Sequence, residues 1–374
     1  YRRQRQMCIR DRAQLVKSAG TLQQLRSADE NVNFGTSSSG GTVITIEQEV
    51  PLVLKLTFAC GPYDRMEALR TGEIRIPGVE LDVVTIQSPR ELFDKVSQGA
   101  DFHLAEMSVS EFVSETCNAH SNHMALPVFP SKVFRHGFIT INTKAGIKHP
   151  CDLAGRRIGV PLYTQTAAIW VRGLLEDEYG VDLSEVSWVQ GAVEKAGSHG
   201  DPNPPPLLKP IRIENNRSDR SLSELLSAGE IDALIGARLP TGLDEDPNLA
   251  RLFPDFRECE KDYYLRTRVH PIMHLVVLKK DLHEAHPWLA PRLYAAFEAA
   301  KQKAWEELSF SGAQKTMLPW LYADIAEIRT VFGHDPWPYG VEANRATLQT
   351  LLSYMHRQHF IAREPTPEEI FVPV

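Results

Sequence analysis

One stretch of the chain places residues capable of acid–base and carboxylate chemistry at the start of an apolar run. Arg135 and His136 are followed by Gly137 and then by the apolar run 138–142. A guanidinium binds carboxylates through two parallel hydrogen bonds, and an imidazole exchanges protons near neutral pH. The run predicts a buried strand, and a core has no need of the polar pair before it. We therefore expect Arg135 and His136 at a ligand cleft between two domains.

Polar side chains recur at the expected ends of other strands and loops. They are Asp64, Arg65, Glu106, Ser108, Tyr163, Gln165, Thr166, Arg238 and His274. No single one is specific, since an arginine at a strand end is most often a surface or ion-pair residue. Their recurrence favours a cleft. The loop 161–166 leads into an apolar helical segment, so its hydroxyls, amide and backbone N–H groups suit an anion.

Several candidates also have an ordinary structural explanation. Ser108 opens a Ser-x-x-Glu sequence, which is a helix-capping pattern. His270 and His274 have the spacing of a metal pair, but a proline directly after His270 and the strand-like surroundings keep them off a common helical face, so no metal site is expected. His274 lies in an apolar strand, where a hydrogen-bonded core histidine is the alternative. Aromatic residues such as Trp337 and Tyr339 more often pack in the core or at the start of a helix than contact a ligand.

The candidate residues depend on strands and helices that the sequence predicts in alternation. Helix starts are marked by Ser-x-x-Glu or Thr-x-x-Glu capping boxes at Ser88, Ser221 and Thr366. Alternation of helix, turn and strand is typical of a doubly wound α/β fold. Buried strands are expected at 52–60, 80–86, 101–105, 138–142, 157–160, 231–236 and 272–278.

The strand pattern also predicts how the chain divides. Connections near 141–147 and near 269–275 join strands that belong to different sheets. We therefore expect one lobe to comprise residues 51–143 and 270–374, and the second to comprise residues 144–269. A cleft between the two lobes would then contain both Arg135 and Arg238.

Composition and length limit the class of protein. The chain has 374 residues, of which 43% are hydrophobic and 24% charged, as in a globular protein of two domains. A formal charge of −7 argues against nucleic acid as the main partner, because phosphate binding needs a basic field. No apolar run approaches the ~18 residues of a membrane span. The glycine-rich nucleotide motifs and the Gly-x-Ser-x-Gly hydrolase motif are absent from the sequence.

The cysteines and the N-terminal region carry little functional information. The five cysteines form no Cys-x-x-Cys pair, so neither a disulfide framework nor a zinc site is expected, and a reducing cytoplasm is the expected location. Residues 1–12 are basic and lack the apolar core of a secretory signal. Residues 36–41 have the composition of a flexible linker. We expect residues 1–50 to be a disordered or artefactual extension.

Seven short motifs follow one another along the rest of the chain. They are Ala-Cys-Gly-x-Tyr-Asp-Arg at 59–65, Glu-Met-Ser at 106–108, Pro-Val-Phe-Pro-Ser-x-x-Phe-Arg-His at 127–136, Gly-Arg-Arg-Ile-Gly-Val-Pro at 155–161, Glu-Ile-Asp-Ala-Leu-Ile at 230–235, Pro-Ile-Met-His at 271–274 and Trp-Pro-Tyr-Gly-Val-Glu-Ala-Asn-Arg at 337–345. In number and order they resemble the 4,5-dihydroxyphthalate decarboxylase family. The resemblance implies two α/β lobes around a ligand cleft, as in type II periplasmic-binding-protein-like folds. It gives no function to the variable loop 193–210.

The resemblance also implies an activity: non-oxidative loss of CO₂ from a dihydroxylated aromatic acid, with 4,5-dihydroxyphthalate giving 3,4-dihydroxybenzoate. Such a site needs an acid over the ring, a group that accepts the phenol proton, and cations for the carboxylates. No organic cofactor is expected, because the ring itself can hold the charge. The expected partner is a small aromatic carboxylate, with no nucleic acid or membrane, and a homo-oligomer is left open.

Roles follow for the residues that match the family motifs or lie beside them. The expected carboxylate clamps are Arg65, Arg135 and Arg238. The candidates for proton transfer are His136, His274, Glu106 and Asp64. The residues expected to orient or contact the substrate are Ser108, Tyr163, Gln165, Thr166, Trp337 and Tyr339.

Among the proton-transfer candidates, the histidines are the better donors to the ring. An unperturbed imidazole titrates near ~6.5, whereas a carboxyl group acts as an acid there only if burial raises its pKa. Nearby arginines would oppose that rise. Glu106 is therefore better suited to orient a partner or to accept the phenol proton. The alternative function is a solute-binding protein of the same fold that binds a small aromatic or carboxylate ligand without catalysis.

Overall fold

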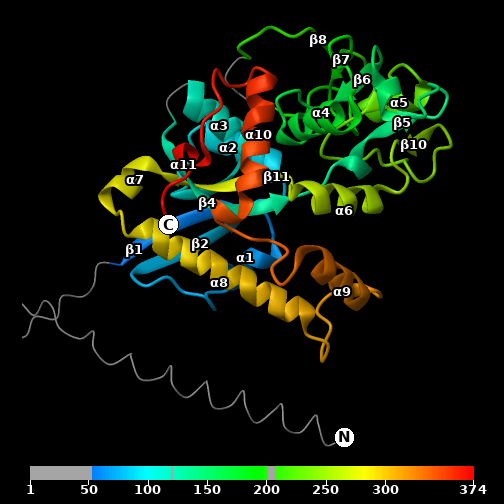
Figure 1. Ribbon diagram of the computed structural model, residues 1–374. Coiled ribbons are helices and arrows are strands. Elements are labelled where there is room, and N and C mark those ends of the chain that lie inside the picture. Colours follow the sequence, from blue (N-terminus) through cyan, green and yellow to red (C-terminus); the bar gives the residue numbers. More distant parts are fainter. Residues whose placement is uncertain (1–52, 119–120, 201–206) are drawn as a thin grey trace, which may run out of the picture. The chain divides into compact units, whose positions relative to one another are not determined.

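The computed structural model describes residues 53–118, 121–200 and 207–374 (Figure 1). The extension expected at residues 1–50 lies outside this part of the chain. The described residues form two mixed β-sheets with helices packed on them, which confirms the two-lobed α/β class expected from the sequence. Within the described residues, no helix has both the length and the apolar character needed to cross a bilayer.

The first sheet has five strands in the order β2–β1–β3–β11–β4. β1 pairs in parallel with β2 and β3, while β11 lies antiparallel between β3 and β4. Figure 1 shows α8 along one side of this sheet, with α2 and α3 on the other. The strands are β1 (Leu54–Cys60), β2 (Val79–Thr85), β3 (Leu104–Ser108), β4 (His123–Lys132) and β11 (Ile272–Lys279). The helices that follow them are α1 (Asp64–Arg70), α2 (Pro89–Ser97), α3 (Val109–Asn118), α7 (Lys280–Ala285) and α8 (Leu289–Ser309).

The second sheet has six short strands in the order β10–β5–β9–β6–β7–β8. β9, β6, β7 and β8 are parallel, and β5 is antiparallel to β9 and β10. The strands are β5 (Thr140–Asn142), β6 (Arg157–Val160), β7 (Ser187–Gln190), β8 (Ile213–Asn215), β9 (Ala233–Leu234) and β10 (Leu249–Arg251). Their helices are η3 (Pro150–Leu153), α4 (Thr166–Tyr179), α5 (Leu222–Ala228) and α6 (Phe256–Thr267), and the C-terminal part of the chain adds α9 (Leu321–Phe332), η4 (Glu342–Asn344), α10 (Arg345–Arg357) and α11 (Pro367–Ile370).

The capping signals in the sequence mark real helix starts. The Ser88 side chain accepts a hydrogen bond from the Glu91 N–H ahead of α2, with proline at the first helical position. Ser221 and Thr366 form reciprocal capping boxes ahead of α5 and α11. Ser108 does not cap α3, because it is the last residue of β3 and its hydroxyl bonds elsewhere. Three of the four capping patterns therefore predicted the local structure.

The strand expected at 138–142 is shorter than predicted. His136–Phe138 form a 3₁₀ turn (η2), and β5 begins only at Thr140. Gly137 lies under the Phe256 ring, where a Cβ would be 2.7 Å from Phe256 Cδ2, so the chain turns where no side chain fits. Because β5 pairs in the second sheet, the chain changes sheets before Thr140, earlier than the expected 141–147. The exact lobe boundaries stay a prediction.

Side chains from the two sheets' helices interlock and hold the two lobes together. Trp170 Nε1 of α4 donates to the Ile272 carbonyl of β11 at 2.8 Å. Arg172 Nε, also on α4, donates to Gln358 Oε1 at 2.8 Å. Gly173 packs so closely on the Tyr354 ring of α10 that a Cβ would be 2.2 Å from it. These contacts fix the N-terminus of α4 against the first sheet, where the candidate site lies.

Candidate active site

A cavity of about 280 Å³ is lined by residues of both sheets. Its walls come from α2, the end of β3, the segment after β4, the start of α4, the loops after β7 and β9, and β11. An apolar cavity of ~150 Å³ is enough for benzene, so this one has room for a single substituted ring. The side chains in its lining that can carry charge are Tyr63, Arg90, Glu111, Arg135, His199, Arg238 and His274.

His274 and Glu106 form a hydrogen-bonded pair at the floor of this cavity. His274 lies on β11 and Glu106 on β3, and antiparallel pairing of these strands brings the two side chains together. His274 Nδ1 is 2.5 Å from Glu106 Oε1. Since Nδ1 is engaged, Nε2 is the nitrogen left for a ligand. The pairing fixes the orientation of the imidazole.

Glu106 is held as a carboxylate although it is fully buried, with 0% of its surface exposed. Burial by itself would raise its pKa, but hydrogen bonds from His274, from the Tyr63 hydroxyl (2.6 Å) and from the Gly61 N–H (2.8 Å) outweigh burial and lower the pKa. Glu106 therefore does not reach the ligand. Of the two roles left open by the sequence, the geometry fits that of an orienting partner for His274.

Arg135 brings a cation into the cavity without an ion-pair partner among the described residues. The residue is only 5% exposed, and its guanidinium lies over the Phe138 ring at 4.9 Å. It donates no hydrogen bond to another described residue, and its Nε is buried without a partner. Burial lowers its pKa to about 9, against a weaker opposing effect of Glu260. Because an unpaired buried charge is costly, this arrangement is that of a site completed by an anionic ligand.

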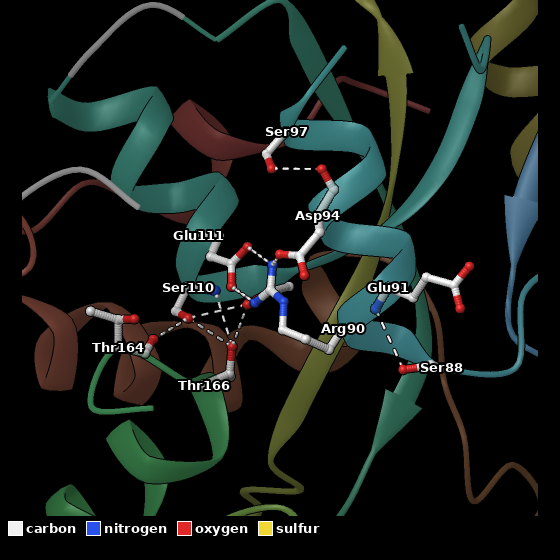
Figure 2. Close-up of polar contacts among 10 residues, drawn as sticks. Ser88, Arg90, Glu91, Asp94, Ser97, Ser110, Glu111, Thr164 and Thr166 are labelled. Atoms are coloured by element: carbon white, nitrogen blue, oxygen red, sulfur yellow. Dashed lines mark hydrogen bonds and ion pairs between the residues drawn. The ribbon is translucent and has the colours of Figure 1, made fainter. Parts of the chain in front are cut away.

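Arg90 is the other deeply placed arginine in the cavity wall, and its charge is already balanced. Figure 2 shows its guanidinium between the carboxylates of Glu111 and Asp94. The distances are 2.6 Å from Nη1 to Glu111 Oε1 and 2.8 Å from Nη2 to Asp94 Oδ1. Burial favours a lower pKa for Arg90, but the two carboxylates raise it. Arg90 is therefore held in place by its two ion pairs. The positive charges of Arg135 and of the exposed Arg238 are balanced less by nearby carboxylates.

The start of α4 contributes hydroxyl and amide groups to the same cavity. Thr166 Oγ1 lies 3.0 Å from Ser108 Oγ. Figure 2 shows its contacts with Ser110: Thr166 Oγ1 is 2.9 Å from Ser110 Oγ and accepts from the Ser110 N–H at 3.2 Å. Gln165 Oε1 is buried without a hydrogen-bond partner among the described residues. The N–H groups of the first helical turn have no intrahelical acceptor. This end of α4 therefore suits an anion or a ring hydroxyl.

Several residues expected in the site lie elsewhere. Arg65 is sandwiched between the Tyr63 and Trp337 rings and donates from Nε to the Pro130 carbonyl at 2.8 Å, so it is not a clamp of this cavity. Arg65, its neighbour Asp64 and Trp337 line a second cavity beside α8 and α9. Tyr163 stacks under Arg172 at 3.8 Å, and Tyr339 is buried close to Lys301. The sequence places these residues near strand ends but does not give their direction.

The two histidines with metal-like spacing do not converge. His270 stacks on the Phe134 ring with centroids 4.6 Å apart, while His274 is paired to Glu106. Among the described residues, no three His, Cys, Asp or Glu side chains cluster as a metal site requires.

His136 also lies outside the cavity, contrary to its expected role as a proton donor. It is 1% exposed and packed edge-on against Tyr179, Phe253 and Tyr263. Burial, with a smaller effect of Arg266, lowers its pKa to about 4. Neighbouring residues at the end of a strand point in different directions, and here Arg135 lines the cavity while His136 packs in the core.

Replacing His136 with phenylalanine is expected to make stability less sensitive to acid. Its pKa is about 4 in the folded chain, against 6.5 for an ordinary histidine. As pH falls from 6.5 towards 4, His136 becomes protonated in the unfolded chain but stays neutral in the folded chain. The free energy of unfolding that is present at neutral pH is therefore lost. The shift corresponds to a loss on the order of 3 kcal/mol.

The measurement is the free energy of unfolding of the parent and His136→Phe at about pH 7.5 and about pH 4.5. Between these two pH values, the free energy of unfolding should fall less for the variant than for the parent. An equal loss in both proteins would contradict the prediction. Activity of the variant serves as the control, because a residue outside the cavity should leave it near the parent value.

Sequence reasoning missed Arg90, Glu111 and His199 as cavity residues. Arg90 and Glu111 stand inside two helix-capping patterns, which gave each of them an ordinary explanation. Their separation along the chain carries no sign that they pair across α2 and α3. His199 lies in a loop without periodicity, so only the fold places it at the cavity.

Comparison with known proteins gives two clear relatives. No protein-family model matches the chain. A protein from Comamonas testosteroni named 4,5-dihydroxyphthalate decarboxylase is 37% identical over 321 residues, covering 86% of this chain and 97% of that protein. A Pseudomonas putida protein of the same name is 37% identical over 212 residues, covering 56% of this chain and 81% of that one.

Among solved structures, the periplasmic aliphatic sulphonate binding protein SsuA from Escherichia coli is 12% identical, with a TM-score of 0.46, and the match covers 86% of this chain and 92% of that chain. The desulfurization enzyme DSZB is 14% identical with a TM-score of 0.41, covering 86% and 96%. The identity and coverage of the Comamonas relative decide the family. The chain belongs to the 4,5-dihydroxyphthalate decarboxylase family.

Proposed function

We propose that this chain is a carboxy-lyase that converts 4,5-dihydroxyphthalate to 3,4-dihydroxybenzoate and CO₂ without oxidation. The observation that carries the proposal is a buried arginine without a counter-ion, Arg135, in the same cavity as the His274–Glu106 pair. An aromatic dicarboxylate supplies the missing negative charge and places a ring beside an acid. Membership of the family supports the same reaction.

The chemistry requires protonation of the ring carbon that bears the departing carboxylate. A hydroxyl para to that carbon makes it more basic, and 4,5-dihydroxyphthalate has such a hydroxyl for each carboxylate. We assign the proton transfer to the His274 imidazolium, whose other nitrogen is held by Glu106. When the carbon–carbon bond then breaks, its electron pair returns to the ring and CO₂ leaves.

Two carboxylates need two points of attachment. We assign one to the Arg135 guanidinium, which can bind it bidentately. The other is assigned to Arg238 together with Gln165 and the first turn of α4, which line the same cavity. A product with one carboxylate loses one of these attachments, which favours its release over a second decarboxylation.

A solute-binding protein would use the same cations but would have no need of a buried carboxylate held against His274. The test is incubation of the purified full chain with 4,5-dihydroxyphthalate, with product followed by chromatography and CO₂ by trapping. Stoichiometric 3,4-dihydroxybenzoate and CO₂ are expected. Binding of the substrate without turnover would overturn the proposal in favour of a receptor. The cytoplasmic location and any oligomeric state stay predictions.

A further inference from the structure

His199 lines the cavity, but the mechanism proposed above gives it no role. It belongs to the loop between β7 and β8 of the second lobe. At Gly200 this loop touches α2 of the first lobe, where a Cβ would be 2.7 Å from Arg90 Cγ and 3.2 Å from Asp94 Oδ2. The loop therefore crosses from one lobe to the other and brings His199 into the wall that also contains His274 and Arg238.

The reaction needs a group that accepts the proton of the para hydroxyl, and the cavity offers few. Arginines cannot accept a proton. The Tyr63 hydroxyl donates to Glu106, and burial together with that carboxylate raises its pKa far above the usual value. Glu111 is ion-paired with Arg90 (Figure 2). Glu106 lies beneath His274 and does not line the cavity.

His199 takes part in no hydrogen bond with another described residue. Apart from His274 Nε2, which we assign to the acid, it offers the free basic nitrogen among the described side chains that line this cavity. We propose that His199 is the base that takes the proton from the substrate hydroxyl para to the departing carboxylate. This assignment rests on the proposed decarboxylation and names a catalytic residue for it.

The electrons and protons of the step balance without a co-reactant. A neutral ring nitrogen of His199 takes the hydroxyl proton, and the O–H bonding pair stays on oxygen. The oxyanion increases electron density at the para carbon, which takes a proton from His274 Nε2. The bond to the carboxylate then breaks, its pair restores the aromatic ring, and CO₂ leaves. His199 returns its proton to the phenolate, and His274 regains one proton from water, the proton that the overall reaction consumes.

The charges around His199 keep it in the neutral form that a base requires. Burial is the largest effect that lowers its pKa, followed by the positive charges of Arg90 and Arg238. Lys195 of its own loop acts in the same direction, and Asp94 of α2 opposes them. His274, by contrast, has its Nδ1 hydrogen-bonded to the buried Glu106 carboxylate at 2.5 Å. A histidine without a hydrogen-bond partner among the described residues and a second histidine held by a carboxylate suit the two opposite proton transfers of the reaction.

A third cavity also includes His199 in its lining. This cavity, of about 460 Å³, is lined by polar groups that include Gln190, Ser198 and Asn215. His199 is common to the two cavities. The imidazole can therefore meet the substrate in one cavity and polar groups in the other, which solvate the charge it acquires.

The test compares the parent with His199→Gln, which keeps a hydrogen-bonding side chain but cannot take up the proton. At about pH 7, kcat with 4,5-dihydroxyphthalate should fall about tenfold to a hundredfold. The deficit should shrink towards about pH 9, where the phenol ionises unaided. It should also shrink with a ring-fluorinated 4,5-dihydroxyphthalate, whose phenol is more acidic. Affinity for phthalate, which has no hydroxyl, should be unchanged and is the control for an intact carboxylate site.

Three results separate the possible failures. A parent that does not turn over the substrate overturns the proposed function itself. If the parent is active, kcat of His199→Gln within about threefold of it overturns the role of His199. A deficit that is the same at every pH and with both substrates also overturns it, because a side chain that only shapes the cavity would give that pattern. His199→Asn is made in parallel and should show the same pH and substrate dependence.

Discussion

Replacement of His274 by glutamine is expected to lower kcat for 4,5-dihydroxyphthalate by about 10²- to 10⁴-fold, the usual contribution of a positioned general acid. Glutamine can still bond to Glu106 but cannot deliver a proton to the ring. Substrate affinity should change little, because the carboxylates are bound elsewhere in the cavity. The measurement is a steady-state comparison of kcat and KM, with Kd for phthalate determined by calorimetry.

His334→Gln provides the matched control, since this histidine is exposed after α9 and lies outside the cavity. Its kinetics should match the parent. If His274→Gln keeps a kcat near the parent value, the Glu106–His274 pair is a structural contact, and the proton must come from another cavity group. If instead kcat is unchanged and KM rises steeply, His274 binds the substrate rather than protonating it.

Replacement of Arg135 by methionine is expected to raise the stability of the fold and to lower the activity. The guanidinium is buried without a protein counter-ion, so its removal should raise the free energy of unfolding by about 1–3 kcal/mol. The lost contact with the Phe138 ring offsets part of this gain. The same change removes a carboxylate clamp, and kcat/KM should fall by about 10²- to 10³-fold. Chemical denaturation and steady-state kinetics measure the two effects.

Arg135→Lys tests the clamp in a second way. Lysine keeps the positive charge but loses the planar fork that fits a carboxylate, so turnover should remain strongly reduced while the fold is intact. Arg75→Lys on the exposed surface is the control and should change neither quantity. Kinetics of Arg135→Lys within about threefold of the parent, which is below ~1 kcal/mol, would show that Arg135 does not bind the substrate.

Local signals in the sequence predicted local structure well. The caps at Ser88, Ser221 and Thr366 were visible because a helix start needs a side-chain acceptor within three residues of its free N–H groups. Arg135 and His274 were found as cavity residues because each is a polar group beside or within a buried strand. The alternation of helices and strands was enough to predict two α/β lobes.

The remaining site depends on contacts that no local pattern encodes. Glu106 meets His274 only because β11 is inserted beside β3, and the register of that pairing is set by the whole sheet. Which of Arg135 and His136 lines the cavity depends on the 3₁₀ turn at 136–138, which lies against Phe256. In the sequence, Gly137 is the one sign of this turn. His199 is brought to the cavity by a loop that crosses between lobes, and such a crossing has no sequence signature.

The position of β11 has a consequence for how the chain is assembled during synthesis. The strands of the second sheet all lie between Thr140 and Arg251, so that sheet can be completed as soon as this segment leaves the ribosome. The first sheet cannot, because β3 and β4 remain unpaired edges until β11 emerges to fill the space between them. Closing such a distant pairing is slow, and open edges can pair with other chains. The nascent chain therefore carries Arg135 and His199 before it carries His274, and the last strand to join the first sheet brings in the residue to which we assign the proton transfer.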